Sequence, residues 1–162
     1  NLNVIRTRAF NHEGPRRDKV FGIPWYAFQI AMIENKLQKP LMKVGGIDDK
    51  RNFTHVKDMV EAYWLSTEKC KAGELYLVGS ESENQIFTFR QALEKLISMS
   101  KIKDIKYETA KEFVRPTKVP YLIATTEKFR KATGWEPKIS FDKILQDTLE
   151  YWRKKVKDND YI

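Results

Sequence analysis

The sequence has few of the residues that build disulfide frameworks or metal clusters. Its 162 residues include one cysteine, Cys70, and two histidines, His12 and His55. A single cysteine excludes an internal disulfide and a zinc cluster built from cysteines. A mononuclear zinc site would need carboxylates to complete the ligand set of the two histidines. We therefore expect a reduced, intracellular chain without a metal site.

Glycine-rich phosphate loops and long apolar runs are also missing. None of the seven glycines stands in a G-x-G-x-x-G or G-x-x-x-x-G-K spacing, at which backbone amides wrap a pyrophosphate. The chain therefore lacks the usual means of holding a dinucleotide by itself, and it has no G-x-S-x-G motif. No stretch approaches the roughly 20 apolar residues of a membrane helix, and no signal-peptide pattern opens the chain. We expect a cytoplasmic protein without a membrane partner.

What is present is enough apolar surface for one packed domain, together with an excess of positive charge. Hydrophobic residues make up 41% of the chain, and 30 Lys and Arg against 22 Asp and Glu give a net charge of +8. This excess favours anionic partners such as nucleotide phosphates, nucleic acid or an acidic membrane face. The lysines are spread along the chain without a helix-turn-helix or RNA-binding signature, so we expect no nucleic-acid partner.

The spacing of apolar residues predicts a mixed α/β domain with more helix than strand. Short apolar runs predict strands at residues 4–10, 41–44, 74–78 and 105–108 and an extended segment at 53–56. Helical spacing predicts helices at about residues 25–35, 57–69, 126–133 and 141–155 and a further one after Thr88. Pro24 is expected in the first turn of the first helix, and Thr88 with Gln91 forms a capping-box pattern.

The first segment that can carry chemistry follows the first predicted strand. Residues 11–17 read Asn-His-Glu-Gly-Pro-Arg-Arg. Ligands of open α/β sheets bind beyond the carboxyl ends of strands. There Asn11 offers an amide, His12 a ring nitrogen and Arg17 a forked guanidinium suited to phosphate. The alternative is a surface loop with solvated arginines, in which Asn11 holds a turn.

The second segment brings Arg51 into a strand–helix junction with an apolar context. Residues 50–56 read Lys-Arg-Asn-Phe-Thr-His-Val. An arginine in such a place needs an anion, either a ligand phosphate or a neighbouring carboxylate such as Asp48 or Asp49, and the residues alone favour the carboxylate. His55 in the same run is expected to be a structural histidine rather than a ligand.

The third segment lies between two prolines. Pro116 and Pro120 hold a rigid extended stretch from which Arg115 projects. A stiff loop with one arginine suits recognition of a phosphate or a ribose. The alternative is a rigid connector without a ligand.

These three segments, in this order, resemble the C-terminal part of extended short-chain dehydrogenase/reductases, the NAD-dependent epimerase/dehydratase family of nucleotide-sugar enzymes. Residues 8–17 resemble most closely the GDP-mannose 4,6-dehydratases, in which an Asn-His-Glu-Ser-Pro-Arg-Arg type motif follows the sixth strand. Residues 50–58 resemble the family's Arg-Asp-aromatic-x-His-Val-x-Asp segment, and residues 128–137 match its closing pattern. The resemblance covers nearly all of residues 4–152.

The resemblance implies a Rossmann-type α/β fold that lacks the N-terminal dinucleotide-binding half. Residues 1–162 would form a single substrate-binding domain, in which residues 1–17 are a strand and loop that complete the cofactor domain. The implied activity is that of an NADP-dependent lyase, a homodimer or homotetramer, that turns GDP-mannose into GDP-4-keto-6-deoxymannose.

The resemblance also implies roles for particular residues. His12 and Arg17 correspond to contacts with the NADP cofactor, and Asn11, Arg51 and Arg115 to groups that hold the pyrophosphate and ribose of the substrate. In the family the Tyr-x-x-x-Lys pair and the other acid–base groups precede the segment that this sequence matches. We therefore expect no catalytic residue in this chain and no activity from it alone.

Some residues depart from the family pattern and leave alternatives open. Asn52 stands where the family has Asp, and Lys118 stands where the dehydratases commonly have an acid. Base and sugar specificity are therefore open, and another epimerase or reductase of the same superfamily is an alternative. An alternative of a different class is a stand-alone basic binding module without catalysis, which would bind nucleic acid in a salt-sensitive way.

Overall fold

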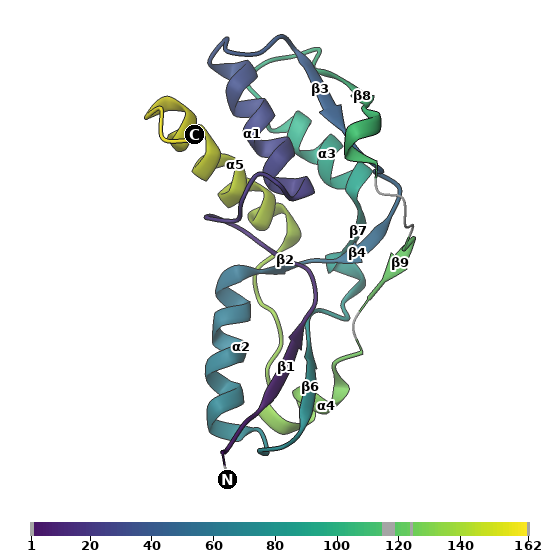
Figure 1. Cartoon of the computed structure of the whole chain (residues 1–162), viewed down its shortest axis with the longest axis vertical. Helices are drawn as coiled ribbons and strands as arrows, with labels where there is room; N and C mark the ends of the chain where they lie inside the picture. Colours follow the sequence, from purple (N-terminus) through teal and green to yellow (C-terminus); the bar gives the residue numbers. More distant parts are fainter. Residues whose placement is uncertain (1, 115–118, 124, 162) are drawn as a thin grey trace.

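The computed structural model describes residues 2–114, 119–123 and 125–161 of the chain. Within these residues the chain forms five α-helices and nine short strands. The molecule is elongated, with helices gathered toward its two ends and short strands between them (Figure 1). We call the two ends, as oriented in Figure 1, the upper and lower regions, and the strands between them the waist.

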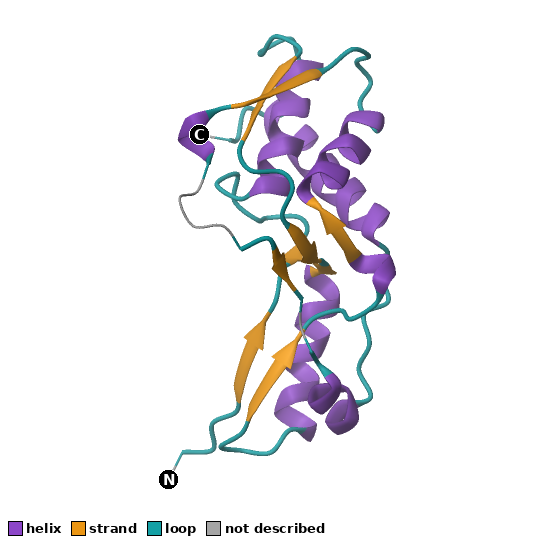
Figure 2. Ribbon diagram, turned by 90° about the vertical axis from the view of Figure 1, so that its right-hand side faces the viewer, coloured by secondary structure: helices purple, strands orange, loops and turns teal. Residues whose placement is uncertain are grey.

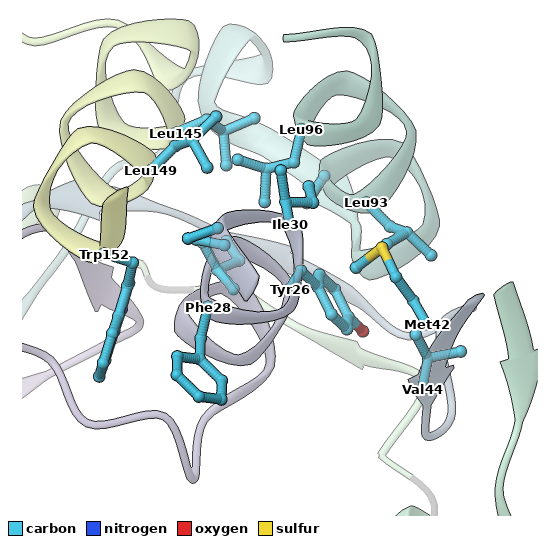
Figure 3. Close-up of a cluster of buried hydrophobic side chains, with 14 of the residues drawn as sticks. Tyr26, Phe28, Ile30, Met42, Val44, Leu93, Leu96, Leu145, Leu149 and Trp152 are labelled. Carbon is cyan, nitrogen blue, oxygen red and sulfur yellow. The ribbon is translucent and has the colours of Figure 1, made fainter. Parts of the chain in front are cut away.

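The upper region is a layer of three helices packed against a parallel pair of strands. The helices are α1 (Gly22–Glu34), α3 (Phe89–Ser98) and α5 (Phe141–Lys157), and the strands are β3 (Leu41–Val44) and β8 (Lys106–Thr109). α1 is buried around most of its circumference because α3, α5 and β3 all contact it, as its apolar composition predicts. Side chains from these four elements meet at one centre (Figure 3).

The helix ends in this region follow the expected capping signals. The Thr88 hydroxyl accepts from the Gln91 backbone N–H, and the Gln91 side chain accepts from the Thr88 backbone N–H, so the predicted capping box is confirmed. Ser140 caps α5 by accepting a backbone N–H three residues on. α1 begins at Gly22, earlier than expected, with Pro24 in the first turn, where its missing N–H has no intrahelical partner to lose.

The lower region is built on a second parallel pair of strands. Its elements are β1 (Arg6–Ala9), β6 (Leu75–Val78), α2 (Val56–Lys69) and α4 (Glu127–Thr133). They enclose a separate, smaller core, made by Met59, Ala62, Tyr76, Val78, Phe129 and Trp135. α4 stops at Gly134, whose φ of 71° lies in the left-handed region that favours glycine. The predicted end of this helix is confirmed.

One face of α2 is exposed although its apolar residues recur at helical spacing. Met59 lies in the lower core, whereas Val60 is 60% exposed and Trp64 is 66% exposed. Next to this helix, β1 is paired on one edge only within the described residues, with β6. An open groove of about 480 Å³ runs between β1 and α2, lined by Asn3, Ile5, Thr7, Tyr63, Ser66 and Thr67. The lower region is therefore only partly covered.

The waist consists of strands of two or three residues. β2 (His12–Glu13) pairs in parallel with β5 (Thr54–His55), and β4 (Lys50–Asn52) lies between β7 (Ile86–Thr88) and β9 (Tyr121–Leu122). β4 is antiparallel to β7 and parallel to β9. Of these strands the sequence predicted only the extended segment at 53–56, because two or three residues show no readable alternation.

The carboxyl ends of both parallel pairs point toward the waist. β1 and β6 rise from the lower end and finish next to the waist, while β3 and β8 point down toward it but end within the upper region (Figures 1 and 2). In open α/β folds ligands bind beyond the carboxyl ends of strands. The fold therefore directs the search for a functional site to the waist.

Candidate functional site

Two segments that are far apart in the sequence meet at the carboxyl end of β1. The Phe10 backbone N–H donates to the Val78 carbonyl at 2.8 Å, and the Thr54 backbone N–H donates to the Asn11 carbonyl at 3.0 Å. Asn11 and the following His12 are half-buried. The loop that the sequence singled out is thus held between the end of β6 and the start of β5.

The structure brings His12 and Arg17, the two predicted cofactor residues, together. Arg17 folds back so that its Nη1 donates to the His12 carbonyl at 2.7 Å. Its guanidinium carbon lies 3.9 Å from the centre of the Phe21 ring, a cation–π contact. The His12 Nδ1 lies 3.0 Å from the Phe10 carbonyl, which can only accept, so this bond assigns a proton to Nδ1.

A buried acid, Glu13, lies between these two residues and was missed by the sequence reasoning. It is 2% exposed, and its Oε2 lies 3.3 Å from the Arg17 Nε. Burial raises the pKa of the Glu13 carboxyl to about 8, an effect that the positive charge of Arg17 only partly offsets. In the sequence, the one indication that Glu13 could interact with Arg17 was its position four residues earlier in the segment after the first strand.

The backbone beside Glu13 is fixed by Gly14. Its φ of 144° is a conformation that other residues rarely adopt, and a Cβ at this position would lie 2.9 Å from a methyl group of Val56. The loop can therefore pass directly against the first residue of α2. A larger residue at position 14 would clash with Val56 and separate β2 from the start of α2.

Arg51 is buried at the centre of the waist, as the sequence predicted. Its Nη2 donates to Asp49 Oδ2 at 3.1 Å and its Nη1 to the Lys50 carbonyl at 2.8 Å. The expected carboxylate partner is confirmed as Asp49. A role of Arg51 in binding substrate is not tested by these contacts and stays a prediction.

The topology also brings Arg51 toward the loop that carries His12 and Arg17. Arg51 precedes Thr54 by three residues, and Thr54 is the ladder partner of His12. At about 3.3 Å per strand residue, the backbone of Arg51 lies roughly 10 Å along the strand from that pair. β9 pairs with β4 so that Leu122 is opposite Arg51. Arg115 and Lys118 lie outside the described residues.

His55 is a structural histidine, as expected. It is fully buried, and its Nδ1 accepts from the Lys57 backbone N–H, so it caps α2. Its Nε2 lies 3.4 Å from Asp147 Oδ2 of α5. Burial lowers the pKa of His55, and the neighbouring Asp147 and Asp58 carboxylates only partly offset that effect.

Asn52 and its neighbours make the interior of the waist polar. The Asn52 side chain is fully buried, and its Nδ2 donates to the Ser80 carbonyl at 2.8 Å. Its Oδ1 and the Thr54 hydroxyl are buried without a hydrogen-bond partner among the described residues. Buried polar atoms without a partner are uncommon in folded proteins. The waist thus offers cations, amides and hydroxyls within one short stretch of backbone.

Two other kinds of site are not found in the part of the chain that the structure describes. It holds no group of three or more His, Cys, Asp or Glu residues placed to bind a metal ion. Nor does any of its helices have both the length and the apolar content to cross a membrane.

Comparison with known proteins identifies related chains. The family model described as GDP-mannose 4,6 dehydratase matches residues 1–148. GDP-6-deoxy-D-mannose reductase of Pseudomonas aeruginosa is 30% identical over 156 residues, which cover 96% of this chain and 50% of the reductase. GDP-mannose 4,6 dehydratase 1 of Arabidopsis thaliana is 31% identical over 137 residues, covering 85% of this chain and 37% of that enzyme.

Solved structures share the fold. The structure of RMD from Pseudomonas aeruginosa complexed with NADPH matches with a TM-score of 0.85 and 29% identity, covering 94% of this chain and 49% of that one. The dTDP-glucose 4,6-dehydratase of Bacillus anthracis in complex with NAD matches with a TM-score of 0.74 and 26% identity over 95% of this chain and 46% of that one. The predicted fold, the C-terminal portion of an extended Rossmann-type short-chain dehydrogenase/reductase, is confirmed. The chain spans about half the length of the curated relatives that it matches most extensively.

Proposed function

Because the chain belongs to the GDP-mannose 4,6 dehydratase family, we propose that it is the substrate-binding half of an NADP-dependent enzyme that acts on a GDP-linked sugar. The observation that carries the proposal is that the loop after β1, with Asn11, His12 and Arg17, pairs with β5 at a polar waist that also contains Arg51. Residues 1–17 would then complete the cofactor-binding sheet, and residues 1–162 would act as one unit.

Substrate binding is assigned to Asn11, Arg51 and Arg115. A diphosphate carries two negative charges, which two guanidinium groups on separate loops can neutralise with forked hydrogen bonds. Arg51 is held in place by Asp49 and the Lys50 carbonyl, so little side-chain freedom is lost when a ligand arrives. The role of Arg115 rests on its place in the sequence motif alone.

Cofactor binding is assigned to His12 and Arg17. The Arg17 Nε is buried against Glu13 while the guanidinium as a whole is partly exposed, so its outer nitrogens can contact an anionic group. The chain has no glycine loop of its own, so these residues would meet the cofactor from one side only. When bound, the nicotinamide supplies or accepts the hydride.

Two reactions fit this family: dehydration of a GDP-sugar and reduction of a 4-keto sugar. A specific observation supports keeping the second as a candidate. The sequence motifs led us to expect dehydration of GDP-mannose to GDP-4-keto-6-deoxymannose. The alignment with the GDP-6-deoxy-D-mannose reductase of Pseudomonas aeruginosa covers 96% of this chain, against 85% for the Arabidopsis GDP-mannose 4,6 dehydratase 1 at nearly the same identity. That difference supports reduction of a 4-keto sugar as the second candidate, in which C4 gains a hydride and its oxygen gains a proton.

The experiment is to express the full-length protein that contains this chain and to offer it each substrate. Dehydration predicts turnover of GDP-mannose with catalytic NADP⁺ and loss of water. Reduction predicts stoichiometric oxidation of NADPH with GDP-4-keto-6-deoxymannose and no reaction with GDP-mannose. Neither reaction in a folded full-length protein would defeat the proposal. The chain alone serves as the inactive control.

The stand-alone basic module predicts something different. It would bind duplex or single-stranded nucleic acid with an affinity that falls steeply with salt concentration. The enzyme proposal expects no such binding at physiological salt, because the positive charge is spread over the chain. A filter-binding titration of this chain at low and physiological salt separates the two.

A further inference from the structure

Glu13 is a buried carboxyl group in the loop that also carries His12 and Arg17. It is 2% exposed and faces Arg17, whose Nε lies 3.3 Å from its Oε2. Both atoms are buried and neither makes a hydrogen bond within the described residues, although they are at ion-pair distance. An acid in this position needs a physical reason, because burying a carboxyl group without full compensation is costly.

Glu13 stands on rigid backbone, whereas Arg17 stands on a tight turn. Glu13 is paired with His55 in the β2–β5 ladder, and Gly14 behind it leaves no room for a side chain against Val56. The turn that follows is closed by Arg16, whose φ of 73° lies in the left-handed region. The carboxyl group is therefore the fixed partner, and the guanidinium is the group that needs to be held.

Three contacts restrain the Arg17 guanidinium. Glu13 faces its Nε, the His12 carbonyl accepts from its Nη1, and the Phe21 ring lies against its plane. Together these contacts leave Nη2 and the outer edge of the group for a ligand. A guanidinium whose orientation is fixed before binding loses less entropy when it meets a phosphate.

The charge state of Glu13 decides whether its carboxyl group leaves the positive charge of Arg17 available to a phosphate or cancels that charge. The charged and titratable groups around it are Arg17 in the same loop, His55 across the ladder, and Asp147 and Asp58, which flank His55. Since the pKa of Glu13 is raised to about 8, the carboxyl group is mostly protonated at neutral pH. A neutral carboxyl group can still accept from Nε–H, but it does not cancel the positive charge of Arg17.

We propose that Glu13 is a positioning residue that holds the Nε side of Arg17 so that its outer edge meets a phosphate of the NADP cofactor. This inference rests on the proposed function and deepens it. Glu13 itself touches no substrate and takes no part in hydride transfer. Glu13 sets the orientation of the Arg17 guanidinium and the net charge of the pair that meets the phosphate.

The inference predicts a dependence of cofactor affinity on pH. Below about pH 8 the carboxyl group is neutral and Arg17 presents a full positive charge to the phosphate. As the pH rises through that value, Glu13 ionises, the pair becomes neutral overall, and the affinity for NADPH falls. Loss of affinity toward high pH is thus expected in the parent enzyme.

The test uses the full-length enzyme that contains this chain, with NADPH as the probe. We compare Glu13→Gln, Glu13→Ala and the control Glu127→Gln, which alters an exposed carboxylate paired with Lys131. Kd for NADPH, KM and kcat are measured between pH 6.5 and 9.5, and thermal unfolding reports folding. Glu13→Ala should raise Kd and KM for NADPH about tenfold at pH 7, which corresponds to about 1.4 kcal/mol, with kcat changed less than about twofold.

Glu13→Gln separates positioning from a merely structural role. The amide oxygen can accept from Nε–H and never ionises, so affinity at pH 7 should stay within about threefold of the parent, and the loss above pH 8 should disappear. In a double-mutant cycle, Glu13→Ala should cause no further loss of NADPH affinity in a protein that already carries Arg17→Ala.

Two results would overturn the inference while leaving the proposed function intact. One is NADPH binding that Glu13→Ala does not change in a folded enzyme. The other is an equal loss of NADPH affinity in Glu13→Gln and Glu13→Ala, with affinity depending on pH as it does in the parent enzyme. If the folded parent, tested first, bound no NADPH at any pH, the proposed function itself would fail.

Discussion

The upper and lower regions of this molecule are built from the same kinds of part but are covered to different degrees. Each has one parallel pair of strands and helices packed on it. In the upper region α1 lies in the middle and is contacted by α3, α5 and β3. Both pairs have unpaired outer edges within the described residues, so the difference lies in the helices: in the lower region α2 exposes Val60 and Trp64.

The difference teaches where the stability of the chain resides. Parallel sheets are normally buried on both faces, and a lone two-stranded sheet is marginal in water. In the upper region α1 covers the face of β3 that carries Met42 and Val44, while the other face of β3 and most of β8 are exposed. In the lower region two large apolar residues of α2, Val60 and Trp64, lie outside the core, so this region is the less covered of the two.

The largest expected effect compares one substitution in each core. Leu149→Ala in the upper core should lower the free energy of unfolding by about 4 kcal/mol, because a closed core cannot collapse around the cavity. Met59→Ala in the lower core should cost about 2 kcal/mol, since the half-covered surroundings can relax. Urea unfolding followed by tryptophan fluorescence measures both. Equal losses would erase the distinction between the two regions.

The next effect concerns an ion pair that ties the upper helices together. Arg153 of α5 donates to the Glu34 carboxylate of α1 through Nε at 2.8 Å and Nη2 at 2.6 Å, and the Glu34 side chain is 6% exposed. Arg153→Met should cost about 3 kcal/mol because it leaves a buried charge without its partner. Changing both residues to Met should recover most of that loss. A double variant no better than the single one would contradict this account.

A smaller effect should appear with pH at the junction of the two regions. Burial lowers the pKa of His55 in the folded chain, so the unfolded chain takes up more protons as the pH falls below about 6.5. The free energy of unfolding should therefore fall between pH 7 and pH 5, and His55→Gln should flatten that slope. Thermal unfolding at a series of pH values is the measurement. An unchanged slope in the variant would show that other groups control it.

The smallest effect on stability is expected at the exposed face of the lower region. Trp64→Ser should change the free energy of unfolding by less than about 0.5 kcal/mol, because the side chain is already mostly in water. The same variant should reduce self-association of the isolated chain, measured by sedimentation velocity over a range of concentrations. A large loss of stability would mean that this face is part of the chain's own core.

Long elements and their ends could be predicted from the sequence, and the waist could not. The helices after Thr88 and Ser140 begin where side chains can cap them, a signal that is local and therefore readable. β2 and β9 have two residues each, and their existence depends on partners from distant parts of the chain. Pairing of that kind leaves no pattern within a short window.

The candidate site shows the same division. The arginine segments could be recognised by their order and spacing, and the partner of Arg51 could be narrowed to a neighbouring carboxylate. Glu13 could not be recognised, because its importance comes from burial and from the way Arg17 folds back across the turn. Likewise, the exposed side of α2 follows the same helical spacing as its buried side, so periodicity alone could not tell them apart.

The edge of β1 that has no partner strand in the part of the chain that the structure describes has a practical consequence for anyone who handles this polypeptide in isolation. A row of free backbone N–H and C=O groups is a template on which any extended peptide can add as a further strand. At the concentrations used for crystallisation, that template would favour filaments or swapped pairs over discrete particles.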